Sequence, residues 1–171
     1  MAHRIAVPTT ALQSTDAVEE ALQLAARFDV PVLITAETLE ERERFARIIH
    51  IASSCSRGPF VALSKETIVA HAERARGGTL FVEDIARLDT SGQAHLFALL
   101  DERLSLVCAW RSQRGGVRVI AGARHHLYRE RHSGAFSESL FYRLNIVHVD
   151  LTRVVPGEPA ARESSTQFER T

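Results

Sequence analysis

A short apolar run followed at once by an amphipathic helix pattern constrains the fold of this chain more than any other feature. The stretch is Val32–His50, VLITAETLEERERFARIIH. Its first residues are apolar and partly β-branched, as in a buried strand, and after a turn apolar residues recur at helical spacing, at Phe45, Ile48, Ile49 and Ala52. A buried strand that leads into a helix is the opening unit of a parallel α/β sheet. The turn between them contains no glycine.

Strand and helix patterns alternate along the rest of the chain. Strand patterns occupy Pro31–Thr35, Phe60–Leu63, Thr79–Val82, Val117–Ala121 and Ile146–Leu151, and Leu104–Trp110 is a further candidate that would return through a hairpin at Gly115 and Gly116. Helix patterns run over about 16–27 (capped by Asp16 with Glu19), after Ser64 (with Ile68, Val69, Ala72 and Ala75 on one face), over 91–103 and around 136–144. This alternation predicts an α/β fold, a three-layer α/β/α domain with a parallel sheet, whose ligands bind at the carboxyl ends of the strands.

Length and composition bound the class of protein. The 171 residues suffice for one domain, and we expect an N-terminal segment (1–15), a core (16–155) and a disordered polar tail (156–171). The formal net charge is zero, so we expect no direct DNA binding.

Two isolated cysteines and the lack of a long apolar run predict a cytoplasmic protein without a membrane segment. His125, His126 and His132 lack the framework of a zinc site, so we expect no metal.

Four motifs in order carry a resemblance to a known family. VLITAETLEERERFARIIH aligns without a gap with VLITGETGTGKELVARAIH, and Gly77–Ile85, GGTLFVEDI, matches GGTLFLDEI. Val117–Arg124, VRVIAGAR, matches VRVIAATN, and Phe136–Asn145, FSESLFYRLN, matches FREDLYYRLN. The chain therefore resembles, from about Asp16 to Leu151, the sigma-54 interaction domain, which is the AAA+ ATPase core of sigma-54-dependent transcription activators (bacterial enhancer-binding proteins).

The resemblance implies a P-loop NTPase-like core in which the phosphate-loop strand lies near the middle of the sheet. It also implies an ancestor that bound ATP and Mg²⁺, formed rings and remodelled sigma-54 RNA polymerase. Between Leu63 and Gly77 only SKETIVAHAERAR stands where the family carries the GAFTGA loop that contacts sigma-54. The helical lid that follows the last strand in the family is also missing from the pattern. We therefore expect no sigma-54 contact.

The phosphate loop corresponds to residues 36–43, whose members are Ala36, Glu37, Thr38, Leu39, Glu40, Glu41, Arg42 and Glu43. The family's glycine positions hold Ala36, Leu39 and Glu41, and its lysine position holds Arg42. Glycines allow backbone N–H groups to cradle phosphates, and side chains here would fill that cradle. Thr38 and Glu41 also form a capping box that satisfies the helix N–H groups a phosphate would use. We therefore expect no cofactor, with ATP and Mg²⁺ implied by resemblance alone.

The other family site positions are altered as well. Glu83 and Asp84 occupy the acidic pair in swapped order, and Arg124 replaces the sensor asparagine. Glu83 and Asp84 are either remnants of a catalytic site or a solvated acidic strand end, or they form a local ion pair with Arg124 or Arg42. Arg124 either binds an anion or pairs with Glu83. In the finger segment the first arginine is Ser137 and the second is retained as Arg143. Arg143 either serves a neighbour's nucleotide in trans or forms a structural salt bridge.

Three functions stay open on the sequence alone. The first is a pseudo-ATPase, a nucleotide-independent binding or regulatory module that docks on an active AAA+ protein or a signalling protein. The second is an ATP-binding, sigma-54-dependent transcription regulator with weak ATPase activity. The third is a relic without a selected activity.

Overall fold

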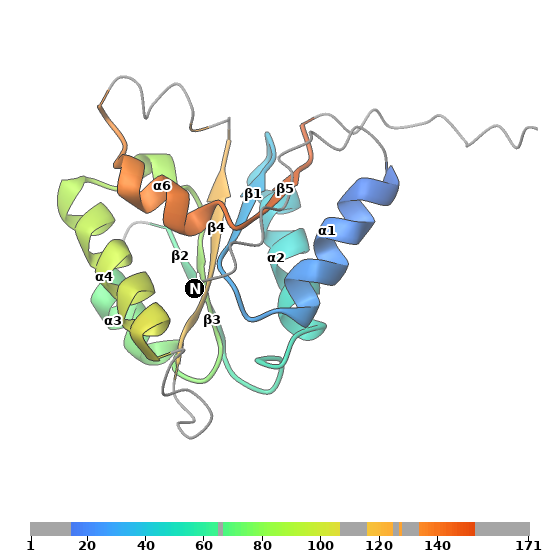
Figure 1. The fold of residues 1–171 in the computed structure, drawn as a ribbon, viewed down its shortest axis with the longest axis horizontal. Helices are drawn as coiled ribbons and strands as arrows, with labels where there is room; N and C mark the ends of the chain where they lie inside the picture. The colour runs from blue at the N-terminus through green and yellow to red at the C-terminus, as the bar shows by residue number, and fades with distance from the viewer. Residues whose placement is uncertain (1–14, 65–66, 107–115, 125–126, 128–133, 153–171) are drawn as a thin grey trace, which may run out of the picture.

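A five-stranded parallel sheet forms the centre of the computed structural model, which describes residues 15–64, 67–106, 116–124, 127 and 134–152 (Figure 1). The strands lie in the order β2-β3-β4-β1-β5. Their bounds are Val32–Thr35 for β1, Phe60–Leu63 for β2, Thr79–Val82 for β3, Arg118–Ala123 for β4 and Val147–Asp150 for β5. The predicted α/β class is confirmed, and β1 lies inside the sheet, between β4 and β5.

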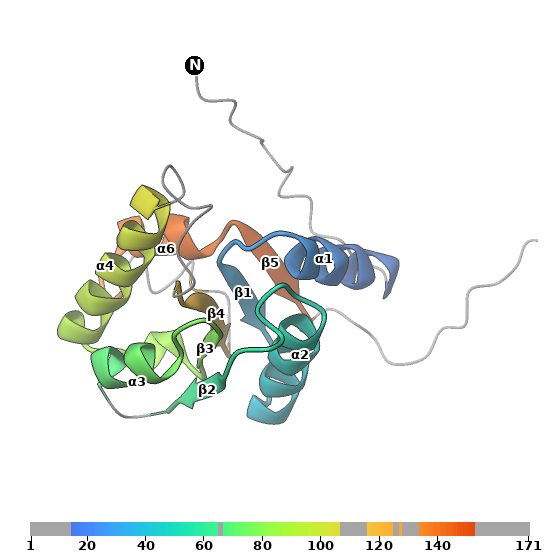
Figure 2. The ribbon, with the colours of Figure 1, turned by 90° about the horizontal axis from the view of Figure 1, so that it is seen from below.

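Helices cover both faces of the sheet, as two perpendicular views show (Figure 1, Figure 2). Helices α1 (Thr15–Arg27) and α2 (Leu39–Ile51) lie on one face. Helices α3 (Ile68–Arg74), α4 (Thr90–Leu106) and α6 (Glu138–Leu144) lie on the other, and a short 3₁₀ turn, η1 (Ile85–Arg87), follows β3. In the part of the chain that the structure describes, no helix has the length and apolar character needed to cross a bilayer.

The central strands are buried along their whole length because both faces are covered. Every residue of β1, β3 and β4 is buried, as expected for parallel strands between two helical layers. Successive side chains point to opposite layers: Val32 and Ile34 pack with α1 and α2, whereas Leu33 packs in the larger core under α3, α4 and α6. Two apolar cores, one on each side, therefore hold the sheet.

One predicted helix start agrees to within a residue and another is wrong. Helix α1 begins at Thr15, one residue before the predicted start, so Asp16 lies in its first turn. Helix α3 starts after Thr67 rather than after Ser64, and the Thr67 side chain makes no capping hydrogen bond. A polar residue near the start of a helix pattern does not by itself identify the N-cap, because the local backbone decides which residue stands at that position.

The predicted strand at Leu104–Trp110 is wrong over its first residues. Helix α4 continues through Leu106, and residues 107–115 lie outside the described part of the chain. Leu104 follows Leu96 and Leu100 at four-residue spacing, which is helical rather than strand periodicity. Strand β4 pairs in parallel with β1 and β3, so it has no hairpin partner among the described strands.

The predicted buried face is rotated from the observed one on α2 and is largely confirmed on α3, where Ile68, Ala72 and Ala75 are buried. On α2 the buried residues are Arg42, Ala46, Ile49 and His50, whereas Ile48 is 41% exposed. On α3, Val69 is 50% exposed although Ile68 and Ala72 are buried. The spacing is correct in both helices, but the buried stripe of α2 takes in two charged or polar residues that an apolar pattern cannot indicate. The N-terminal segment and the polar tail lie outside the described residues and stay predictions.

Candidate functional site

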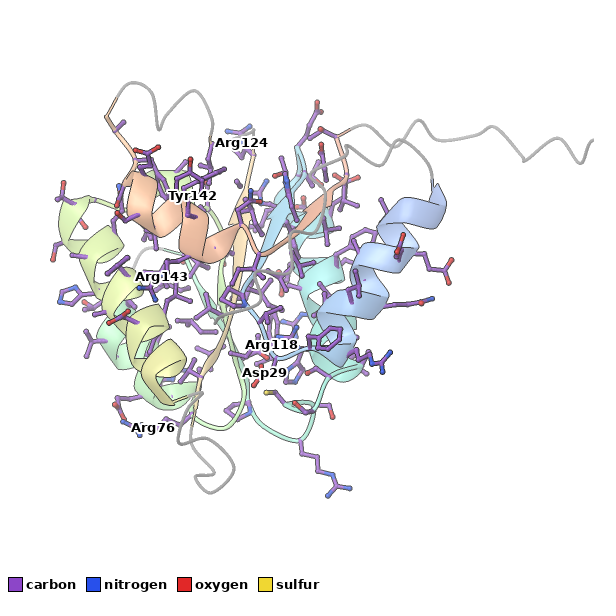
Figure 3. All side chains as sticks on the ribbon, in the orientation of Figure 1. Asp29, Arg76, Arg118, Arg124, Tyr142 and Arg143 are labelled. Carbon is purple, nitrogen blue, oxygen red and sulfur yellow. The ribbon has the colours of Figure 1, made fainter. Side chains whose placement is uncertain are left out.

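The carboxyl ends of β1, β3 and β4 meet at one edge of the sheet, where the sequence predicts the site. They surround a hollow of about 440 Å³. Its lining residues come from the β1–α2 loop, from the first turn of α2, from the ends of β2, β3 and β4 and from η1: Glu37, Thr38, Leu39, Glu40, Arg42, Ser64, Glu83, Asp84, Arg87 and Arg124. Figure 3 shows the exposed Arg124 at the end of β4. The phosphate-loop positions, the acidic pair and the sensor position are thus brought together.

Thr38 caps α2 as predicted. The backbone N–H of Glu41 donates to Thr38 Oγ1 at 3.2 Å. The Thr38 hydroxyl in turn donates to Glu41 Oε2 at 2.9 Å, so the Glu41 carboxylate contacts the threonine side chain rather than the Thr38 N–H. The predicted capping box is therefore confirmed in its N-cap half only. An N-cap of this kind satisfies one of the N–H groups that a helix N-terminus would otherwise offer to an anion. Glu40 and Glu41 in the first turn supply negative charge at the positive end of the helix dipole.

Arg42 lies inside the loop, in the position that the resemblance gives to the phosphate-binding lysine. The residue is only 4% exposed. Its Nη1 donates to the Ala36 carbonyl at 2.7 Å and to the Glu37 carbonyl at 3.4 Å, and its Nε donates to the Glu83 carbonyl at 3.1 Å. The interior of the loop therefore presents carbonyl oxygens to a cation.

Burial lowers the pKa of Arg42, and the nearby Arg124 lowers it further. The carboxylates of Asp84, Glu40 and Glu83 act in the opposite direction and raise it. An ordinary arginine pKa is high enough that the guanidinium still keeps its proton at neutral pH. The loop therefore encloses a permanent positive charge that its own carbonyls and the surrounding carboxylates compensate.

The two acidic residues after β3 have structural contacts. The Glu83 N–H donates to the Leu63 carbonyl at 3.1 Å, which continues the pairing of β2 and β3, and the Glu83 carbonyl accepts from Arg42. Asp84 caps η1, because its Oδ1 accepts from the Ala86 N–H at 3.3 Å. The contact between Arg42 and this segment is with the main chain of Glu83.

The finger segment lies away from the hollow. Ser137 caps α6, with its Oγ accepting from the Leu140 N–H at 3.4 Å. Arg143 contacts α4: its Nη2 lies 2.7 Å from Asp101 Oδ1, and its guanidinium carbon lies 5.0 Å from the centre of the Phe97 ring (Figure 3). Glu43, the last residue of the loop segment, pairs with Arg47 at 2.6 Å on the outer side of α2. Neither Arg143 nor Glu43 lines the hollow.

Sequence reasoning missed two residues at this site, Ser64 and Arg87, which line the hollow. Gly122, inside the sensor motif Val117–Arg124 that the sequence places at the site, lies directly against Arg42. No pattern identifies the first two. Gly122 does carry a signal, since an isolated glycine inside a strand often marks a close approach of another group.

Within the described residues, no group of three histidine, cysteine or acidic side chains is arranged to hold a metal ion. His125, His126 and His132 lie outside those residues.

Solved structures support the fold. NtrX from Brucella abortus in complex with ADP matches 82% of this chain and 36% of that chain, with a TM-score of 0.65 and 24% identity. The P-loop NTPase domain of a sigma-54 transport activator from E. coli matches 78% of this chain and 98% of that chain, with a TM-score of 0.60 and 20% identity. The fold is therefore that of a P-loop NTPase domain.

Several curated relatives carry the names of regulatory proteins. The chain is 35% identical over 170 residues to the sigma-54-dependent transcriptional activator SfnR of Pseudomonas putida, matching 82% of this chain and 46% of the relative. It is 30% identical over 157 residues to a Nif-specific regulatory protein of Rhizobium leguminosarum bv. trifolii, matching 77% of this chain and 44% of the relative. The chain thus spans less than half the length of these relatives.

The family model described as "Sigma-54 interaction domain" matches residues 64–150, just over half of the chain. The matched range begins after α2, so the loop that holds Arg42 lies before it. The four sequence motifs, the sheet order and these matches agree, and the chain belongs to the sigma-54 interaction domain family.

Proposed function

We propose that this domain, residues 16–155, is a nucleotide-independent binding or regulatory module in bacterial transcription or signalling. One observation carries the proposal: the Arg42 guanidinium is buried within the loop that would hold a triphosphate and donates to the carbonyls of Ala36, Glu37 and Glu83. A domain whose phosphate site is filled by its own side chain has no need of ATP to reach its folded shape.

The polarity of the loop opposes phosphate binding. A phosphate cradle turns backbone N–H groups toward the ligand, whereas this loop turns two carbonyls inward. A triphosphate would have to displace Arg42 from a buried site and reverse those peptide groups. The residues present therefore do not fit Mg-ATP bound in the manner of a phosphate loop.

The charge of the hollow acts in the same direction. Four acidic residues (Glu37, Glu40, Glu83 and Asp84) and three arginines line it, and one of the arginines, Arg42, already has carbonyl partners. A carboxylate about 4 Å from a phosphate costs on the order of 4 kcal/mol per unit charge at an intermediate dielectric constant. The positive charges of Arg87 and Arg124 alone do not neutralise the negative charges of four acidic residues and a polyanionic ligand.

A protein partner, either an active AAA+ protein or a signalling protein, would then supply the function. The face around α6 supports such docking, because Tyr142 is 61% exposed and Ile146, just beyond the helix, is 40% exposed. The connection from β2 to β3 contains only the short α3 among its described residues, so contact with sigma-54 through a long loop is not part of the proposal.

Isothermal titration with Mg-ATP tests nucleotide independence. We expect only heats of dilution for this chain, with the corresponding domain of Brucella abortus NtrX, which has been crystallised with ATP, as the positive control. Saturable binding at micromolar Kd would contradict the proposal. A pull-down from the native cytoplasm with and without ATP then tests the partner, which should be retained equally in both.

A second candidate is an ATP-binding regulator with weak ATPase activity. It is favoured by the common location of Glu83, Asp84 and Arg124 around one hollow. This candidate requires phosphate release that is lost in both Glu83→Ala and Asp84→Ala. Turnover that stays at background in the folded wild-type chain would eliminate it.

A further inference from the structure

We propose that the loop between β1 and α2 is a guanidinium-binding cradle whose resident ligand is the Arg42 side chain, and that Gly122 is the positioning residue that admits this ligand. The inference deepens the proposed function and rests on it, because it names the group that fills the loop in place of a nucleotide.

The acceptors of the cradle match a guanidinium rather than a simple cation. Arg42 Nη1 reaches the carbonyls of Ala36 and Glu37, and Nε reaches the carbonyl of Glu83. The three acceptors come from two separate segments and engage different nitrogens of one planar group. A planar fork of donors can satisfy such an arrangement, whereas an ammonium is a single point of charge.

The sheet holds these acceptors in place independently of Arg42. The Ala36 N–H donates to the Ala123 carbonyl at 3.1 Å, and the Glu83 N–H donates to the Leu63 carbonyl at 3.1 Å. The two segments are therefore anchored to β4 and β2 by their own backbones. The cradle should persist when the Arg42 side chain is removed.

Gly122 provides the space in which the Glu83 carbonyl and the Arg42 side chain both lie close to β4. A Cβ at this position would lie 2.5 Å from the Glu83 carbonyl oxygen, 3.0 Å from Arg42 Cδ and 3.2 Å from Arg42 Nε. Gly122 is paired with Ile34 in the β1–β4 ladder, so the strand cannot easily retreat. Its φ is not in the left-handed region, and the requirement for glycine is therefore one of space.

Chemical rescue of Arg42→Ala tests the cradle. The variant should melt below wild type, and millimolar methylguanidinium should raise its melting temperature by roughly 3–6 °C at about ten times the Kd. Methylammonium at equal concentration and ionic strength should not raise the melting temperature of Arg42→Ala. Neither compound should change the melting temperature of the wild-type chain. Equal effects of the two cations on Arg42→Ala would overturn the proposal.

The role of Gly122 is tested in the same assay. Gly122→Ala should lower the melting temperature, whereas Gly116→Ala is a matched control that should leave it unchanged, since a Cβ there meets nothing within 4 Å. The double variant Arg42→Ala/Gly122→Ala should lose the methylguanidinium rescue. A rescue that persists at full size in the double variant would exclude Gly122 as the positioning residue.

Different results would contradict the proposed function and the cradle. Binding of Mg-ATP to the wild-type chain contradicts nucleotide independence, whereas the cradle is decided by cation selectivity in Arg42→Ala, without any nucleotide present. The added Cβ also lies 2.5 Å from the Glu83 carbonyl oxygen, so if neither Gly122 variant yields folded protein, the cation selectivity of Arg42→Ala alone decides the proposal.

Discussion

At the scale of single residues, the burial of Arg42 decides what the loop can hold. A buried charge is tolerated only where hydrogen bonds satisfy it, and here the partners are main-chain carbonyls of the loop and of the β3 end. Because these partners are neutral, the guanidinium also interacts with the surrounding carboxylates at longer range. Removing Arg42 would leave inward-facing carbonyls without their donor, which is costly in a buried site.

A second buried polar group makes stability depend on pH. His50 is 7% exposed, and its Nδ1 lies 2.9 Å from Thr79 Oγ1. Burial lowers the pKa of His50 below 6.5, and the positive charges of Arg118 and Arg47 lower it further. As pH falls below 6.5, the unfolded chain therefore binds a proton before the folded chain does, and the free energy of unfolding decreases until the lowered folded pKa is reached.

We predict that urea unfolding of the wild-type chain shows this loss below pH 6.5 and that His50→Gln reduces it. The glutamine keeps a hydrogen-bonding group near Thr79 but does not titrate. His95→Gln, at an exposed position, is the control and should keep the wild-type slope. The prediction would be contradicted if the free energy of unfolding changed with pH equally in His50→Gln and in the wild-type chain.

At the scale of elements, the start of α2 is stabilised from within the chain. Thr38 accepts from the Glu41 N–H, and acidic residues occupy the first turn. We predict that Thr38→Ala lowers the free energy of unfolding by about 1 kcal/mol, the usual value of such a cap. The chain offers a matched control, because Thr67 stands at the N-cap of α3 without a side-chain capping bond.

Denaturant unfolding of both variants provides the comparison. Thr67→Ala should differ from wild type by much less than Thr38→Ala. If the two substitutions had equal effects, the cap of α2 would not be a specific stabilising contact.

Helix α6 is tied to α4 through Arg143, which contacts both Asp101 and the ring of Phe97. The Arg143–Asp101 ion pair is partly exposed, so its contribution to the free energy of unfolding is modest. We predict a coupling energy of about 0.5 kcal/mol between Arg143 and Asp101, measured by urea unfolding of Arg143→Ala, Asp101→Ala and the double variant. A coupling energy of zero would show that the ion pair does not hold Arg143 on α4 and would favour a role for Arg143 toward a partner.

At the scale of the whole molecule, local patterns predicted the sheet well. The bounds of β2 and β3 match the predicted strands, and the strand ends meet as a parallel sheet requires. The N-cap of α2 at Thr38 was also predictable from the sequence, because a threonine followed three residues later by a glutamate is a local signature of a helix start. The last residues of α4 were misassigned because an apolar run of that length fits a strand or a helix.

The occupant of the loop could not be predicted in the same way. An arginine in the first turn of a helix, between glutamates, normally faces water. Its burial depends on a carbonyl at Glu83 and on the absence of a side chain at Gly122, and both lie far from it in the sequence. Local pattern analysis does not join residues that only the sheet brings together.

The most direct test of the filled loop is a crystal structure of this chain grown with Mg²⁺ and a non-hydrolysable ATP analogue. We predict that Arg42 Nη1 stays within hydrogen-bond distance of the Ala36 carbonyl and that no triphosphate density occupies residues 36–43. Triphosphate density wrapped by the backbone of residues 36–43, with Arg42 displaced, would contradict the account.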